Sequence, residues 1–217
     1  MSDKFDALVN SRFSIFMNFL YKIMIINLLY LFTLLIGLFF FTFSAASIST
    51  YVCMKGLNEQ KEFPIVKTYF TIFKQEYRNA ILFTLYYMFT FSILGISFYY
   101  YLHTEDLFFN TIGMVVVGFL IAVNLASYIH ILLISIYTPS IKLRSKIKYS
   151  YLMQLYKPVL TILLLVMNGL LILFAYTFIT FSFMFTFAFM AYYNISISKR
   201  AYLKVSNDYI PLDVLSL

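Results

Sequence analysis

The side chains best suited to chemistry in this 217-residue chain are few and scattered. His103 shares one short segment with the acidic residues Glu105 and Asp106, whereas His130 stands alone in a long apolar run, and Cys53 is the single cysteine. A short ligand cluster without a second motif does not have the spacing of a metal site. The sequence also lacks the HExxH, GxSxG, GxxxxGK[ST] and GxGxxG motifs. We therefore expect no enzyme activity, no catalytic residue, no metal and no cofactor.

A second set of polar side chains lies inside the apolar runs, and Asn124, His130 and Asn168 could line a polar path. Hydrogen bonding between helices is the commonest use of such residues in a membrane, and we favour it here. Ion-coupled carriers usually bury several ionisable groups, and His130 is the only acidic or basic side chain within the expected membrane spans. A small stand-alone transporter or channel remains the alternative.

The elements that would position these residues are membrane spans. Hydrophobic residues make up 62% of the chain and charged ones 12%, with a mean hydropathy of +0.85, against roughly 45–50% and about 25% in soluble domains. Runs free of Asp, Glu, Lys and Arg all exceed the ~20 residues of a transmembrane helix: Ile23–Met54, Asn79–Thr104, Leu107–Ile141 and Pro158–Ser198.

The last run would form a helix about twice as long as the bilayer is thick, so we expect it to turn back as a hairpin near residues 175–180. The predicted fold is an all-α, polytopic transmembrane helical bundle in a single domain, with about five spans and amphipathic interfacial helices. The expected spans are residues 23–45, 80–102, 108–136, 158–176 and 178–198.

Charge asymmetry predicts the sidedness. Cytoplasmic loops collect Lys and Arg, so segments 55–78 and 142–157 and the C-terminal tail are placed in the cytoplasm of a bacterial plasma membrane. The acidic connection 103–110 is placed outside. Five spans would also put the N-terminus outside. An amphipathic interfacial helix over Phe5–Ile23 leads into the first span and could lie on either surface of the membrane. Because the net charge of +7 is divided among these loops, it does not predict nucleic-acid binding.

Two basic loops carry candidate surface sites. In the first, a cytoplasmic loop helix is expected over 64–78, with an apolar stripe on one face: Val66, Tyr69, Phe70, Phe73 and Tyr77. This stripe either anchors the loop helix among the lipid headgroups or forms a docking surface for a partner protein. In the second, alternating basic residues are expected to contact the headgroups of anionic membrane lipids: Lys142, Arg144, Lys146 and Lys148.

One stretch carries a family resemblance. Residues 41–55 resemble the TxGAaxxAlyxvxxK segment of the bacterial YesL-like family, and the matching positions are Thr42, Ala45, Ala46, Tyr51 and Lys55. Segment 70–80 resembles the helix FfxxFKqNfkqa of that family, and Tyr137–Pro139 and the basic stretch to Pro158 also look familial. The chain departs from the family at Ser44, where the family has glycine. Small side chains allow close helix approach, which makes this a candidate packing surface: Thr42, Ser44, Ala45, Ala46 and Ser49.

The resemblance implies a function that the residues alone do not. Members of that family have no established function, and they are commonly encoded beside carbohydrate ABC importers in Gram-positive bacteria. It therefore implies an accessory or subunit of such an importer, with the importer's permease subunits and membrane lipids as partners.

Overall fold

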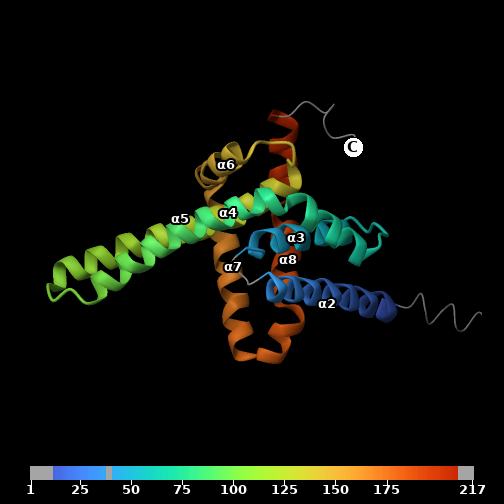
Figure 1. Cartoon of the computed structure of the whole chain (residues 1–217), viewed down its shortest axis with the longest axis horizontal. Coiled ribbons are helices and arrows are strands. Elements are labelled where there is room, and N and C mark those ends of the chain that lie inside the picture. Colours follow the sequence, from blue (N-terminus) through green and yellow to red (C-terminus); the bar gives the residue numbers. More distant parts are fainter. Residues whose placement is uncertain (1–11, 38–40, 210–217) are drawn as a thin grey trace, which may run out of the picture.

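The computed structural model describes residues 12–37 and 41–209, and helices joined by short turns make up this part of the chain (Figure 1). The residues described contain no β-strand, so the predicted all-α fold is confirmed. In chain order the helices are α2 (Arg12–Ile36), α3 (Phe43–Asn58), α4 (Ile65–Leu102), α5 (Leu107–Tyr137), α6 (Leu143–Tyr156), α7 (Pro158–Thr177) and α8 (Ile179–Tyr209).

Four of these helices are long and apolar enough to cross a membrane, over Phe13–Ile36, Ile65–Leu102, Leu107–Tyr137 and Pro158–Thr177. This confirms a membrane-embedded helical bundle. The fifth predicted span, 178–198, corresponds to α8, which is not one of the four. Polar residues of α8 lie in the protein interior, where they need not be apolar to suit the lipid: Thr186, Asn194 and Ser198.

The first predicted span, 23–45, differs from the structure. Helix α2 ends at Ile36 and α3 begins at Phe43, so the charge-free run is divided between two helices. Helix α3 is only ~24 Å long by its residue count, shorter than the hydrocarbon core. Most of its side chains are buried by neighbouring helices, which explains how a helix rich in Ser and Thr is tolerated there.

The predicted loop helix 64–78 and the predicted span 80–102 are also not separate. They form one helix, α4, because no glycine or proline interrupts the chain between Ile65 and Leu94. At its N-terminal end the predicted amphipathic helix Phe5–Ile23 begins outside the described residues, and from Arg12 onward it is continuous with α2.

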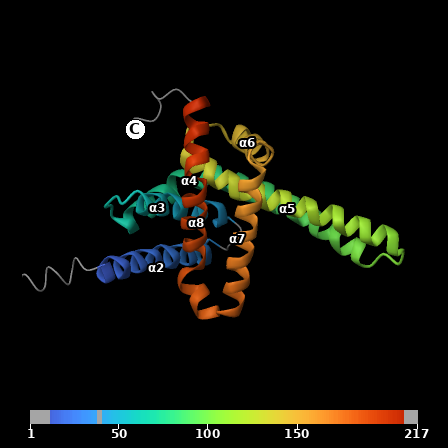
Figure 2. The same cartoon turned by 180° about the vertical axis from the view of Figure 1, so that it is seen from behind.

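Helix α3 lies at the centre and contacts α2, α4, α5 and α8 (Figures 1 and 2). Consecutive helices form antiparallel hairpins: α4 with α5 and α7 with α8. The α4–α5 hairpin extends away from the other helices, and the two views agree on this. Helices α2 and α3 approach each other near their connection, where Tyr30 and Leu34 pack against Ala46.

Helix α2 packs against α8 through aromatic and polar contacts. The ring of Phe19 packs against Tyr192, and further along α2 the ring of Tyr30 packs against Phe187. Between them, the Asn27 side chain donates to the Phe183 carbonyl at 2.8 Å and accepts from the Ala188 amide at 3.1 Å. Helix α2 thus lies across the α7–α8 hairpin rather than along it (Figures 1 and 2).

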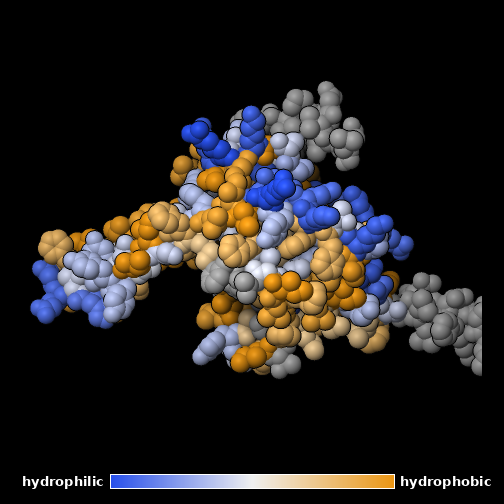
Figure 3. Space-filling model, in the orientation of Figure 1, coloured by the Kyte–Doolittle hydropathy of each residue, from blue (hydrophilic) through white to orange (hydrophobic). Residues whose placement is uncertain are grey.

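The face of the molecule seen in Figure 3 carries two hydrophilic zones with an apolar zone between them. One hydrophilic zone follows the upper and right-hand margin of this view, over α6 and the segment that joins α3 to α4. The other covers the far tip of the α4–α5 hairpin, at the left. An apolar layer between two polar layers is the pattern of a protein embedded in a bilayer.

Candidate functional site

The family-like stretch forms the centre of the bundle. All five predicted packing residues are buried: Thr42, Ser44, Ala45, Ala46 and Ser49. At the position where the family has glycine, the Ser44 hydroxyl accepts a hydrogen bond from Thr84 of α4 at 2.8 Å. The hydroxyl of Tyr128 in α5 donates to Ser44 and Ser47, both at 3.4 Å. The serine at this position thus joins α3 to two neighbouring helices.

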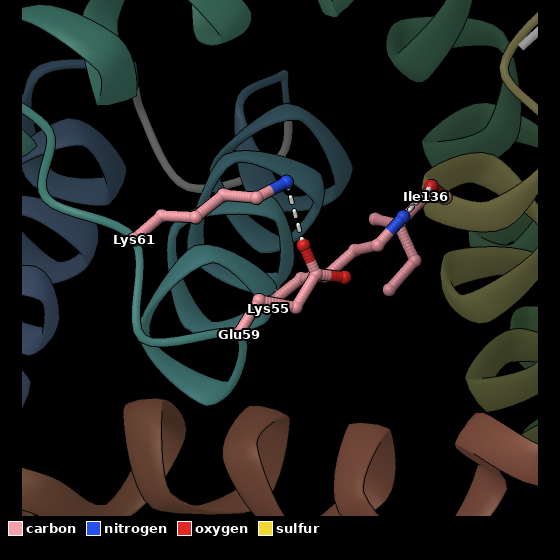
Figure 4. A network of polar contacts seen from close by, with 4 residues as sticks. All are labelled: Lys55, Glu59, Lys61 and Ile136. Atoms are coloured by element: carbon pink, nitrogen blue, oxygen red, sulfur yellow. Dashed lines mark hydrogen bonds and ion pairs between the residues drawn. The ribbon is translucent and has the colours of Figure 1, made fainter.

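Lys55 ends the family-like stretch and reaches a second helix (Figure 4). Its ammonium donates to the Ile136 carbonyl at 3.2 Å and stands 4.7 Å from the centre of the Tyr137 ring. Both partners lie in the last turn of α5, where carbonyl groups lack helical partners and carry the negative end of the helix dipole. Lys55 therefore caps α5 from α3, which fixes the positions of these two helices relative to each other.

An ion pair lies beside this cap. Lys61 contacts the Glu59 carboxylate at 2.8 Å, one turn beyond Lys55 (Figure 4). Burial lowers the pKa of Lys55, and the negative charge of Glu59 opposes that effect. Partial burial alone would raise the pKa of Glu59, but the hydrogen bond from Lys61 and the charge of Lys55 outweigh it, so this pKa lies below its usual range. The two lysines therefore favour the charged form of the Glu59 carboxylate.

His130 is the hub of a buried chain of hydrogen bonds. Its Nδ1 lies 2.6 Å from the Tyr202 hydroxyl and its Nε2 lies 2.8 Å from the Thr161 hydroxyl. Because Thr161 donates its own proton to the Lys157 carbonyl, it accepts from Nε2, and Nδ1 accepts from Tyr202. This assigns a neutral histidine with the proton on Nε2. The chain joins α5, α7 and α8 at one end of the bundle.

The other two residues of the predicted polar path have partners of their own. The Asn168 amide donates to the Asn194 carbonyl oxygen at 2.8 Å, and Asn194 donates back at 3.2 Å and to the Tyr51 hydroxyl at 2.7 Å. Asn124 accepts from the Tyr151 hydroxyl at 2.9 Å. In the part of the chain that the structure describes, no hydrogen bond joins Asn124, His130 and Asn168 to one another. The geometry places them at three helix junctions.

The predicted docking stripe is divided by the fold. Tyr69 is completely buried, with its hydroxyl 2.9 Å from Thr33 of α2. Phe73 and Tyr77 are half-buried against the core, whereas Val66 and Phe70 remain exposed. The prediction of one continuous docking surface was wrong, because three of the five side chains pack α4 against the bundle.

The predicted headgroup residues are also divided. Lys142, Arg144 and Lys148 are exposed, but only 3% of Lys146 is accessible. Burial lowers the pKa of Lys146, and the charge of Glu76 on α4 counteracts this effect. Lys146 is therefore not a headgroup contact, since its side chain lies on the face of α6 that packs inward with Ser150 and Met153.

Sequence reasoning missed Tyr202 and Thr161, the two partners of His130. Nothing in their spacing marks them, because they come from two different helices, 31 and 72 residues away from the histidine. Within the described residues, no group of His, Cys, Asp and Glu side chains is placed to hold a metal ion.

The apolar helices, the interior hydrogen-bonded junctions and the polar rims define a polytopic α-helical membrane protein. Residues 23–98, which contain α3 and the Lys55 cap, match the model of a family described as a protein of unknown function, DUF624. This family includes the YesL-like proteins, so the match confirms the predicted family over residues 23–98. The resemblance noted around Pro139 and Pro158 lies beyond the matched residues and stays a prediction. No curated protein and no solved structure matches the chain.

Proposed function

We propose that this chain is a non-enzymatic accessory or subunit of a carbohydrate ABC importer in the plasma membrane of a Gram-positive bacterium, and that it acts by contact with the permease subunits. The family resemblance suggests the importer. The physical support has two parts. The candidate polar-path residues form hydrogen bonds that hold helices together, and a separate apolar surface is exposed for contact with a partner.

That surface lies on α6. This helix is too short and too polar to be one of the candidate spans, yet it exposes Leu152, Tyr156 and 81% of Leu155. Arg144 and Lys148 continue the same exposed face toward the start of the helix. An exposed apolar patch rimmed by charge on such a helix is typical of an interaction site. This patch on α6, more than the stripe on α4, is the observation that carries the proposal.

The proposal includes a sidedness. We place the start of α2, the α3–α4 connection, α6 and the end of α8 on the cytoplasmic side, and the tip of the α4–α5 hairpin outside. The position of α2 supports this, because its start and the α3–α4 connection lie on the same side of the molecule, opposite the tip of the α4–α5 hairpin (Figures 1 and 2). Helix α8 leads into Lys199 and Arg200, which favours the cytoplasm for its end. It differs from the prediction of an external N-terminus, which depended on counting 23–45 as one complete span.

A photo-crosslinking amino acid at Leu155 tests the function in native membranes. We expect a covalent adduct with an importer permease subunit, and no such adduct from the same reagent at Phe108, which is exposed at the opposite end of the bundle. Deletion of the gene should also reduce uptake of the importer's sugar. Sugar uptake that is unchanged, together with no permease adduct at Leu155, would refute the proposal.

The alternative is a stand-alone transporter or channel. It would require that the junctions around Asn124, His130 and Asn168 open to form a path. Purified protein in liposomes would then transport solute by itself, and His130→Leu would abolish the flux. This outcome would favour the alternative over the accessory role.

A further inference from the structure

An apolar groove lies between α2 and the start of α4. Its volume is about 530 Å³, within the range of ligand sites in proteins, roughly 300–1,000 Å³. Lys67 lines it together with apolar residues: Ile25, Phe63, Pro64, Ile65, Val66 and Phe70. The groove thus combines an apolar floor with a single positive charge.

The two walls of this groove belong to different environments. Ile25 lies within α2, one of the helices suited to cross a membrane, whereas Phe63 and Pro64 belong to the connection before α4. That connection is hydrophilic at its surface, with Lys61 and Glu62 exposed (Figure 3). The groove therefore lies where the apolar layer of the molecule meets a polar rim.

Either water or lipid can fill a groove at such a boundary, and the residues that line the groove determine which of the two binds there. Val66 and 39% of Phe70 are exposed to the groove side of α4 with no polar neighbour in the lining other than Lys67. Hydrocarbon satisfies this surface and water does not. A molecule that fits both parts has an acyl chain and, at one end, a negative charge within reach of a lysine.

We infer that this groove binds an anionic phospholipid of the cytoplasmic leaflet, with an acyl chain between Ile25 and Phe70 and the phosphate beside Lys67. Lys22 lies one helical turn before Ile25, on the same side of α2, and adds to the positive potential. A lipid held here joins α2 to α4 at the place where the α4 stripe leaves Val66 and Phe70 uncovered.

The inference uses the cytoplasmic position of this rim and does not depend on the importer. Failure to crosslink a permease subunit at Leu155 would leave it intact. Conversely, an empty groove would leave the proposed contact of α6 unaffected.

The chain contains no tryptophan, so Phe70→Trp creates a single fluorescent reporter in the groove. The purified protein would be reconstituted in phosphatidylcholine vesicles that contain either brominated phosphatidylglycerol or brominated phosphatidylcholine. Bromine quenches tryptophan on contact, so quenching reports which lipid occupies the site. We expect the relative association constant at this reporter to favour phosphatidylglycerol about fivefold, the effect of one well-placed lysine.

Three variants control for general attraction to a basic surface. Lys67→Gln in the Phe70→Trp background should remove most of this preference, whereas Lys74→Gln, on the same helix beyond the groove, should keep it. Phe13→Trp, exposed on the same side of the molecule, should show little preference. If Phe70→Trp disturbs folding, Val66→Trp provides a second reporter. Equal preferences at positions 70 and 13, no effect of Lys67→Gln, or no quenching by either lipid would each overturn the inference.

Discussion

The ring of Phe19 in α2 packs edge to face against the ring of Tyr192 in α8, with their centres 5.2 Å apart. Aromatic pairs of this geometry contribute roughly 0.5–1.5 kcal/mol beyond their buried area. This pair joins the first half of α2 to the middle of α8. With Tyr30 against Phe187, it holds α2 where it crosses α8.

Removing the Lys55 cap should destabilise the bundle. Lys55→Ala leaves the Ile136 carbonyl without its donor, and we expect a loss of about 1–2 kcal/mol in the free energy of unfolding. Lys61→Ala removes an exposed ion pair and should cost less than about 0.5 kcal/mol. Denaturation of both variants in the same detergent gives the comparison. Equal losses would mean that Lys55 does not act through α5.

The paired amides should show measurable coupling. Asn168→Leu and Asn194→Leu each break the reciprocal bond, and a double-mutant cycle should give a coupling of about 0.6 kcal/mol, the average for such bonds in membrane proteins. Asn194→Leu should cost more than Asn168→Leu, because it also removes the partner of the Tyr51 hydroxyl. Strictly additive losses would contradict a direct pair.

Two glycines of α5 should respond differently to alanine. A Cβ at Gly113 would overlap the Tyr101 ring of α4, so Gly113→Ala should push apart the outer end of the α4–α5 hairpin at a cost of about 1–3 kcal/mol. A Cβ at Gly118 meets no neighbour, so Gly118→Ala should be neutral or stabilising by up to about 1 kcal/mol. Thermal unfolding of the two variants distinguishes these results, and a stable Gly113→Ala protein would show that the helices are not in close contact there.

Length and charge were sufficient to predict the helical class and the α7–α8 hairpin. The charge-free run Pro158–Ser198 is too long for one crossing, and the structure turns at Phe178, within the expected 175–180. The corresponding break between α2 and α3 was missed because hydropathy is continuous across it. Gly37 was the available signal, since it follows the last residue of α2 and a Cβ there would overlap Thr42.

The junctions of the candidate site could not be predicted in the same way. Asn168 and Asn194 were recognisable as buried polar residues, but their pairing depends on the register of the α7–α8 hairpin, which no local pattern specifies. The stripe on α4 had the correct helical period. The spacing of the apolar residues does not predict that Tyr69 is buried and Phe70 exposed, because that difference depends on where α2 and α3 pack against α4.

Cysteine accessibility in intact cells tests the shared cytoplasmic face most directly. Cys53 is buried and can be replaced by alanine, so single cysteines can be placed at Phe13, Lys61 and Glu105 for reaction with a membrane-impermeant maleimide. We predict that Glu105→Cys reacts in intact cells, whereas Phe13→Cys and Lys61→Cys react only after the membrane is permeabilised. Reaction of Phe13→Cys in intact cells would place the start of α2 outside and contradict the common cytoplasmic face.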